Sequence, residues 1–318
     1  MDNLTIITEF ILMDIASSRE IQILQGLLFL VIYLGALAGN LLTVMVIVID
    51  PHLHFPMYFF IANLSIVDFC YISVTVPKSI VNSLTGRKSI SLPECVAQIF
   101  LYSSFAALEY ALLIVMSYDR YVAICQPLHY GIVVTPHMCA QAAGGSWVCG
   151  LVYSAMHTGT IFSLPFTKSN VIYQYFCDIP QLLRISSSHV QFSEYILIAV
   201  SSVISLICFA FLFTSYVKIF STVFKMRSEE ARNKALFTCT PQLVILVLFM
   251  ISILMAALSP VSNKASLRSL LIAMFYNMVP PVMNPIVFSL RNKEINSALG
   301  RMFNRYFVFT SRNVLDSK

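Results

Sequence analysis

The feature that most constrains this chain is a long apolar run near its start. Residues 23–49 (ILQGLLFLVIYLGALAGNLLTVMVIVI) contain no charged side chain. A helix of about 20 apolar residues is long enough to cross a bilayer. Across the chain 58% of residues are hydrophobic and 11% are charged, whereas soluble domains carry about 25% charged residues. A soluble domain would expose too much of this surface to water, so we predict an integral membrane protein.

Helices and closed β-barrels are the two structures that satisfy backbone groups within lipid. Barrel strands would read as segments of about ten residues with alternating polarity. The apolar runs here are longer and continuous, which favours helices. The sequence therefore predicts an all-α membrane protein, a seven-transmembrane helix bundle. Its spans are expected at 23–49, 57–82, 95–123, 138–163, 191–220, 234–258 and 267–290.

The distribution of Lys and Arg predicts the orientation, because these residues collect on the cytoplasmic side. Five lie in the predicted loop 217–234 and six in the tail 291–318, whereas segment 1–22 has Arg19 and four acids. We expect 1–22 outside, 23–290 as the membrane domain and 291–318 in the cytoplasm. The pattern of residues 291–307 predicts an amphipathic helix on the membrane surface. A solvated tail is the alternative.

Two features of the predicted outer side concern covalent chemistry. Asn3 begins an Asn-Leu-Thr glycosylation acceptor, and the N-terminal stretch lacks the pattern of a removable signal peptide. Cys95 starts the third span and Cys177 lies in the outer loop 164–190. Both face an oxidising compartment, where a disulfide persists. A bridge between them would hold the loop over the mouth of the bundle.

Acidic side chains inside the spans indicate a polar interior. Asp68 in the second span and Glu109 in the third are the deepest, and such groups face the bundle interior and find partners. We expect them to share a pocket near Asn284, with one protonated or a cation between them. The alternative is that they fix helix packing. If Glu109 points inward, Ala106 and Tyr102 share its face and lie in the outer half, where they could line a small-molecule site.

Several motifs occur in a family-like order along nearly the whole chain. They are GN at 39–40, PMYFFIANLSIVD at 56–68, MSYDRYVAIC at 116–125, Trp147, SYVKIFSTV at 215–223, KALFTCTPQL at 234–243 and PVMNPIVFSLRNKE at 281–294. This pattern resembles the odorant receptors among the rhodopsin-like G-protein-coupled receptors. Seven motifs in order at matching spacings make the resemblance specific.

The resemblance implies roles for individual residues. Arg120 would leave Asp119 on activation and help to open the cytoplasmic face to a heterotrimeric G protein. Tyr121 belongs to the same motif, and Tyr216 and the Asn284-Pro285 pair would support the rearrangement. A family-like ligand pocket would use Tyr102, Ser103, Ala106, His157, Val200, Ser201, Ile204, Ile253, Leu254, Ala257 and Asn277. For His157 the alternative role is helix packing, and for Ser201 it is a bond to its own helix backbone.

The chain also departs from the family pattern. Thr167 and Ser187 stand where the family usually has a second cysteine pair in the outer loop, so both partners are missing together. Phe288 replaces a tyrosine of the broader receptor class, and its ring cannot form a hydrogen bond with Tyr216. Pro241 lies in the sixth span, where a proline could bend the cytoplasmic end.

Absent residues narrow the function. The seventh span has no Lys between 269 and 290, which excludes a retinal Schiff base. The outer half of the third span has no acidic residue that could pair with an amine ligand. We therefore expect a small, mostly apolar, volatile ligand, with cyclic AMP raised through a stimulatory olfactory G protein. No cofactor, metal or nucleic acid is expected. The predicted location is the plasma membrane, in the cilia of olfactory sensory neurons.

Other classes of protein remain to be weighed. A receptor for a non-odorant metabolite outside the nose would keep the same fold. A transporter would favour paired repeats with broken helices around a midplane site, and the seven spans do not divide evenly. An enzyme would need a nucleophile–base or metal constellation. The six histidines are scattered and no HExxH or GxSxG motif occurs, so we predict no enzymatic activity.

Overall fold

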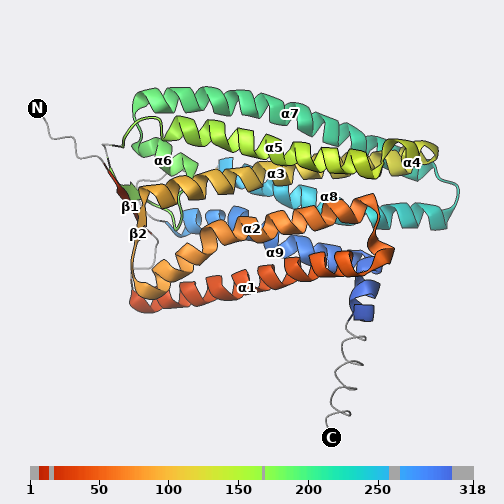
Figure 1. Cartoon of the computed structure of the whole chain (residues 1–318), viewed down its shortest axis with the longest axis horizontal. Coiled ribbons are helices and arrows are strands. Elements are labelled where there is room, and N and C mark those ends of the chain that lie inside the picture. Colours follow the sequence, from red (N-terminus) through yellow and green to blue (C-terminus); the bar gives the residue numbers. More distant parts are fainter. Residues whose placement is uncertain (1–6, 14–17, 167–168, 258–265, 303–318) are drawn as a thin grey trace, which may run out of the picture.

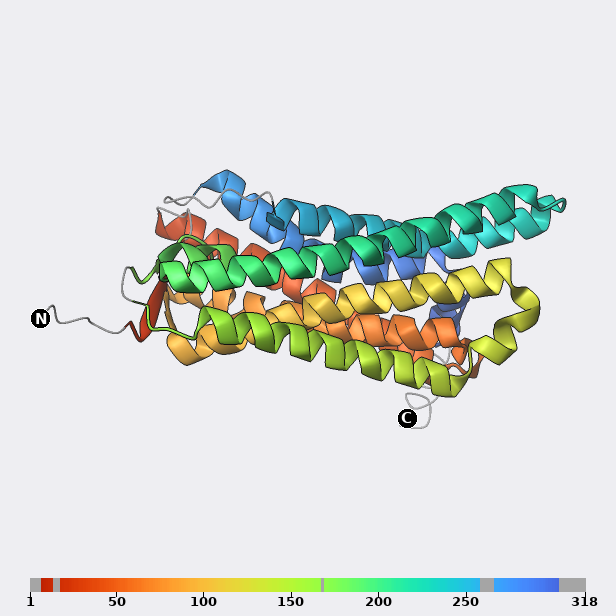
Figure 2. The ribbon, with the colours of Figure 1, turned by 90° about the horizontal axis from the view of Figure 1, so that it is seen from above.

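The computed structural model describes residues 7–13, 18–166, 169–257 and 266–302. Within these ranges seven long helices lie side by side along one axis (Figures 1 and 2). They are α1 (Arg19–Ile49), α2 (Pro56–Thr85), α3 (Leu92–Cys125), α5 (Pro136–Ile161), α7 (Ser188–Lys225), α8 (Glu229–Ala257) and α9 (Leu267–Arg291). The predicted seven-helix bundle is confirmed.

Six of the helices in the described part of the chain are long and apolar enough to cross a membrane. The helix outside this set is α5, which carries no charged residue but is rich in Gly, Ala, Ser and Thr. Its small residues allow close packing on α3. A Cβ atom at Gly150 would lie 2.7 Å from the carbonyl oxygen of Ser104, so a larger residue there would push the two helices apart.

Side-chain caps and prolines determine where several helices begin. Ser91 and Glu94 form a capping box at the start of α3. Ser187 caps α7 by accepting a hydrogen bond from the Val190 backbone N–H. At the end of α2, Gly86 takes a left-handed conformation with φ of 74°, which glycine adopts without steric cost. The short elements are η1 (Pro51–Leu53), η2 (Pro127–His129), α4 (Tyr130–Val133) and α6 (Ile179–Ile185).

The helix ends differ from the predicted spans on the cytoplasmic side. The predicted bounds of the loop 217–234 are wrong, because α7 continues to Lys225 and α8 begins at Glu229, which leaves residues 226–228 between the helices. Charged residues can extend a helix into water beyond the membrane, so a count of apolar residues underestimates helix length. The predicted tail helix is present over residues 293–302, with Ile295 and Ala298 buried against the bundle. The remainder of the predicted tail helix lies outside the described residues.

A small sheet covers the opposite end of the bundle, which we call the outer end following the predicted orientation. Strand β1 (Glu9–Leu12) pairs antiparallel with β2 (Ser89–Ser91) and parallel with β3 (Val171–Ile172). Phe10 in β1 is fully buried, and its ring centroid lies 5.3 Å from that of Phe166. The sequence pattern did not predict these strands.

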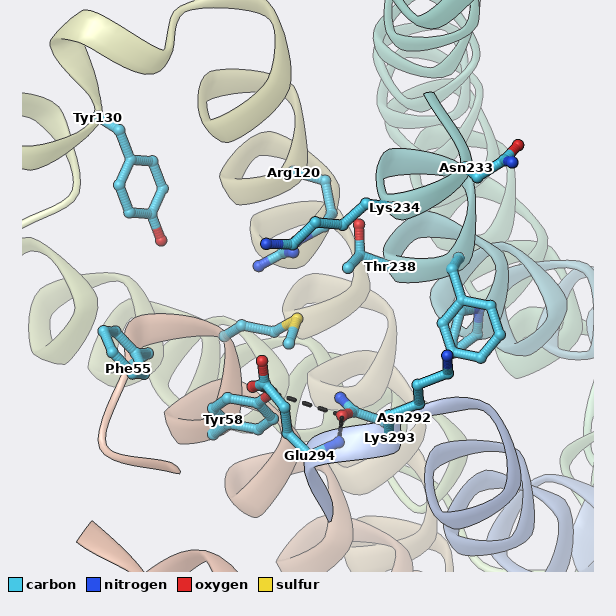
Figure 3. Close-up of a pocket in the computed structure, with 13 residues that line it drawn as sticks. Phe55, Tyr58, Arg120, Tyr130, Asn233, Lys234, Thr238, Asn292, Lys293 and Glu294 are labelled. Atoms are coloured by element: carbon cyan, nitrogen blue, oxygen red, sulfur yellow. Dashed lines mark hydrogen bonds between the residues drawn. The ribbon is translucent and has the colours of Figure 1, made fainter. Parts of the chain in front are cut away.

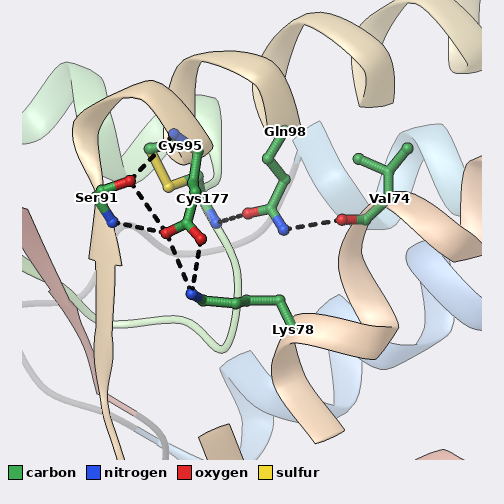
Figure 4. The surroundings of a disulfide bond; sticks show 7 residues. Val74, Lys78, Ser91, Cys95, Gln98 and Cys177 are labelled. Carbon is green, nitrogen blue, oxygen red and sulfur yellow. Dashed lines mark hydrogen bonds and ion pairs between the residues drawn. A yellow bond between two sulfur atoms is a disulfide. The ribbon is translucent and has the colours of Figure 1, made fainter. Parts of the chain in front are cut away.

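The predicted disulfide is present at this outer end (Figure 4). Cys95 at the start of α3 is bonded to Cys177, which follows β3 in the outer loop. The Cys177 backbone N–H donates to Gln98 Oε1 at 2.7 Å, and Gln98 Nε2 donates to the Val74 carbonyl at 3.1 Å. The outer loop is thereby fastened to both α3 and α2.

The acidic residue after Cys177 gives a pH-dependent prediction. Burial raises the pKa of the Asp178 carboxyl from 3.8 to about 6, although the Tyr276 hydroxyl donates to its Oδ2 atom and opposes the shift. The folded loop therefore favours the protonated acid, and stability is lost as the pH rises from about 4 to 6. Asp178→Asn keeps an acceptor for Tyr276 and removes the charge.

We expect Asp178→Asn to raise the unfolding temperature of the purified receptor in detergent at neutral pH. The gain over the native chain should be absent near pH 4, grow up to about pH 6 and then level off. A gain that is independent of pH would contradict the assignment of the effect to this carboxyl.

Candidate functional site

Arg120 lies near the cytoplasmic end of α3 in a compact ion pair. Its Nε and Nη2 atoms donate to Asp119 Oδ2 at 3.1 and 2.6 Å, and both residues are buried. The Tyr130 hydroxyl donates to the other oxygen, Asp119 Oδ1, at 2.8 Å. Burial and the Asp119 charge raise the pKa of Tyr130, so its hydroxyl keeps the proton that it donates. The sequence analysis missed Tyr130, which lies in the short helix α4 and belongs to none of the motifs.

A cavity of about 560 Å³ opens beside Arg120 (Figure 3). Its positive charges come from Arg120, Lys234 and Lys293, and its one acidic lining residue is Glu294. The other lining residues are Phe55, Met57, Tyr58, Tyr130, Asn233, Phe237, Thr238, Pro241 and Asn292. The lining comes from α2 and Phe55 just before it, from α3, α4 and α8, and from the start of the tail. A shift of α8 relative to α3 would therefore change the shape of the cavity.

The tail helix is fastened to the α1–α2 side of this cavity. Tyr58 donates hydrogen bonds to Glu294 and, at 3.4 Å, to Asn292 Oδ1 (Figure 3). Further out, Arg301 pairs with Asp50 in the segment between α1 and α2, with Nη2 and Oδ2 2.5 Å apart. These partners are more than 230 residues apart in the sequence, and no short motif contains both members of a pair.

Three further residues predicted to act in activation lie on α3, α7 and α9. Tyr216 of α7 is buried, and its hydroxyl has no hydrogen-bond partner among the described residues. Tyr121 lies beneath Lys218, whose Nζ atom is 5.6 Å from the ring centroid. Pro285 lies inside α9, where a Cβ atom added at Gly39 would come within 3.0 Å of its ring. Their roles in activation stay predictions.

The two acidic residues of the spans meet at one amide in the middle of the bundle. Asn284 Nδ2 donates to Asp68 Oδ2 at 2.8 Å and to Glu109 Oε1 at 3.3 Å, and all three residues are buried. Asp68 Oδ1 and Asn284 Oδ1 have no partner within the described ranges. Two ionised carboxylates this close would repel each other, and a shared proton or cation would relieve the repulsion. Whether a cation binds stays a prediction.

Aromatic side chains fill the outer end between α2, α3 and α9. The Tyr102 ring stacks on Tyr71 with centroids 4.8 Å apart and also contacts Phe176 of the outer loop at 5.5 Å. Asn277 Oδ1 accepts a hydrogen bond from Thr75 at 2.9 Å. Of the predicted ligand contacts, Tyr102 therefore packs against α2 and the outer loop, and Asn277 is hydrogen-bonded to α2.

The other predicted ligand contacts fall into two groups. Ser103 and His157 are buried, and Ala106 and Ser201 are half-buried. Ser201 Oγ lies 3.3 Å from His157 Nε2, so its partner is this histidine. The exposed members are Val200, Ile204, Ile253, Leu254 and Ala257. They lie on α7 and α8, which pack lightly against each other, and their place in a pocket stays a prediction.

The sequence analysis missed Glu194 as a buried acid. It lies near the outer end of α7, is fully buried and pairs with His157 Nδ1. A charged residue within the predicted span 191–220 was the signal that could have identified it. Two residues singled out in the sequence lie outside the described ranges: Asn3, the predicted glycosylation acceptor, and Thr167, at a position where we expected the family to have a cysteine.

Comparison with solved structures identifies the fold. The crystal structure of squid rhodopsin superposes with a TM-score of 0.73, covering 91% of this chain and 87% of that one at 16% identity. At this identity the likeness concerns the fold alone. The class defined by fold and helix order is the rhodopsin-type seven-helix membrane bundle.

Sequence comparison identifies the family. The family model described as olfactory receptor matches residues 29–306. Human olfactory receptor 14I1 is 51% identical over 97% of this chain and 99% of its own length. Human olfactory receptor 14A16 is 49% identical over 95% and 97%, respectively. The chain belongs to the olfactory receptor family, and it is a multi-pass receptor of the plasma membrane and not an enzyme.

Proposed function

We propose that this receptor binds a small, mostly apolar, volatile molecule in the outer half of its bundle and activates a heterotrimeric G protein. The partner is the stimulatory olfactory type, which raises cyclic AMP, and the site of action is the cilia of olfactory sensory neurons. The observation that carries this proposal is the paired, buried Arg120 beside a cytoplasmic cavity of about 560 Å³. Opening of the Asp119–Arg120 pair would couple ligand binding to G-protein docking.

The chemistry of the outer half supports a largely apolar ligand. The positions on α3 that we predicted to face the ligand are Tyr102, Ser103 and Ala106, and all three are uncharged. Tyr102 is packed among aromatic rings. A small molecule has few atoms with which to offset the freedom it loses on binding. Affinity in the micromolar range or weaker is therefore expected.

The middle of the bundle supports coupling between the two ends. Asn284 joins α2, α3 and α9 through its bonds to Asp68 and Glu109. Glu109 and Arg120 lie on the same helix. A ligand that moves α3 at the outer end would therefore disturb both the Asn284 cluster and the Arg120 ion pair.

The test is a cyclic AMP screen of an odorant panel in cells that express the receptor and the stimulatory olfactory G protein. At least one volatile compound should raise cyclic AMP in native cells and leave cells with an Arg120→Gln variant unchanged. A native receptor that is present at the surface and silent to the whole panel would contradict the proposal.

Substitutions of Tyr102 test the outer pocket. Tyr102→Ala removes the ring between Tyr71 and Phe176. The outer loop that carries Phe176 should then change its position, and the EC50 of an active odorant should change by about tenfold or more. Tyr102→Phe keeps the stacking, and its effect should be smaller. The predicted pocket face is wrong if neither variant alters any response while surface expression is intact.

A further inference from the structure

Glu194 presents an unused hydrogen-bond acceptor inside the outer half of the bundle. The residue is fully buried, and its Oε1 atom pairs with His157 Nδ1. Its second oxygen, Oε2, is buried and has no hydrogen-bond partner in the described part of the chain. A buried carboxylate oxygen without a donor is costly. A donor brought in by a ligand would remove this cost.

The surroundings fix the orientation of this carboxylate. Because a carboxylate accepts hydrogen bonds, His157 donates through Nδ1–H, and its Nε2 atom then accepts from the Ser201 hydroxyl at 3.3 Å. The Tyr153 ring covers the imidazole, with centroids 4.4 Å apart. Oε1 is thus committed to His157, and Oε2 is the atom left for another partner.

The carboxylate belongs to a polar stripe on one face of α7. Glu194, Ser201 and Ser205 are spaced by seven and four residues, which places them on one side of a helix. Ser205 accepts through its carbonyl oxygen a hydrogen bond of 3.0 Å from the Tyr110 hydroxyl of α3. Glu194 and Ser201 contact His157 of α5, so the stripe faces α5 and α3 and not the lipid.

We propose that Glu194 Oε2 is the polar recognition point of the odorant site, and that its ligands carry a hydroxyl or amino hydrogen-bond donor on an apolar body. This inference rests on the proposed odorant-receptor function. Val190 and Ile161, one helical turn from Glu194 and His157, are buried in an apolar cluster at the same end, so the Oε2 atom lies next to apolar surroundings. The site discriminates between compounds by their ability to donate a hydrogen bond to this oxygen.

A matched series of compounds tests the proposal on the native receptor. The probes are linear primary alcohols of six to ten carbons, the aldehydes and methyl ethers of the same chain length, and the corresponding primary amines. Alcohols should act at EC50 values about tenfold or more below those of the aldehydes and ethers, which cannot donate. The amines also donate, so they too should act at EC50 values below those of the aldehydes and ethers.

Glu194→Gln supplies a test that a purely structural role would not pass. The Gln carbonyl oxygen stays with His157 Nδ1–H, so an N–H donor replaces the Oε2 acceptor. Aldehydes can accept a hydrogen bond from this N–H group, so their potency should rise relative to that of the alcohols. The aldehyde-to-alcohol EC50 ratio should fall about tenfold or more. Glu94→Gln is the matched control, since Glu94 is half-exposed at the start of α3 and pairs with Lys78. The aldehyde-to-alcohol EC50 ratio of this variant should equal that of the native receptor.

The outcomes separate this inference from the proposed function. Equal responses to alcohols and their methyl ethers in the native receptor would overturn the inference and leave odorant reception standing. An unchanged aldehyde-to-alcohol ratio in a Glu194→Gln variant at the cell surface would also overturn it. Silence of the native receptor to every compound would contradict the proposed function and, with it, this inference. If Glu194→Gln does not reach the surface, the native series alone decides.

Discussion

Replacing Arg120 with Gln is expected to abolish ligand-evoked cyclic AMP while the receptor still reaches the cell surface. Gln cannot supply the guanidinium that lies 2.6 Å from Asp119 Oδ2 in this structure. Nor can it present a positive charge in the cavity that opens beside α3. Arg120 is 8% exposed, so the loss concerns a specific contact and not a general surface charge. The measurement is a cyclic AMP dose–response curve normalised to surface receptor.

The partner of Arg120 provides a variant with the opposite effect. Asp119→Asn removes the negative charge that retains the guanidinium, so ligand-independent cyclic AMP should rise several-fold. Tyr130→Phe deletes the hydrogen bond that orients Asp119 and should raise basal activity by a smaller amount. An Arg120→Gln receptor that still responds to odorant at native potency would refute the role of the ion pair.

Loss of the Cys95–Cys177 bridge is expected to have the second-largest effect. The bond closes a loop with a sequence separation of 82 residues, for which the chain-entropy model gives about 4.5 kcal/mol of stabilisation. It also positions Phe176 against Tyr102. Cys95→Ser and Cys177→Ser should each reduce surface expression several-fold. The double variant should resemble either single variant, because one bond is lost in all three.

A matched control for the bridge is available in the same chain. Cys149 of α5 is an unpaired, exposed thiol, so Cys149→Ser makes the same chemical change without breaking a bond. Flow cytometry of tagged receptors in intact cells compares the four variants. Native surface levels for both bridge variants would contradict a stabilising role for the disulfide.

Much of the bundle could be predicted because a bilayer imposes a minimum helix length. Residues 23–49 were expected as a span, and α1 covers them. The extra turns of α7 after residue 220 and of α8 before residue 234 could not be predicted, because charged residues such as Lys225 and Arg232 were read as loop residues. Charged residues can continue a helix in water. Strand β1 has four residues, which is too short for a periodic pattern to identify.

The candidate site was predictable where a residue is chemically conspicuous in its surroundings. Asp68 and Glu109 stand out within apolar spans, and the structure places both on Asn284. Tyr130 is an unremarkable residue in a loop, and its contact with Asp119 depends on the path of the chain after α3. Glu194 could have been identified from the sequence, because it is a charged residue within the predicted span 191–220. Its partner, His157, is 37 residues away on another helix.

The most direct test of the account is nucleotide exchange on a purified stimulatory olfactory G protein by purified receptor in lipid nanodiscs. The probe is the most active primary alcohol of the matched series. We predict that it accelerates exchange several-fold with the native receptor and has no effect with Arg120→Gln. Acceleration that persists without Arg120, or exchange that never depends on the odorant, would contradict an outer ligand site coupled to Arg120.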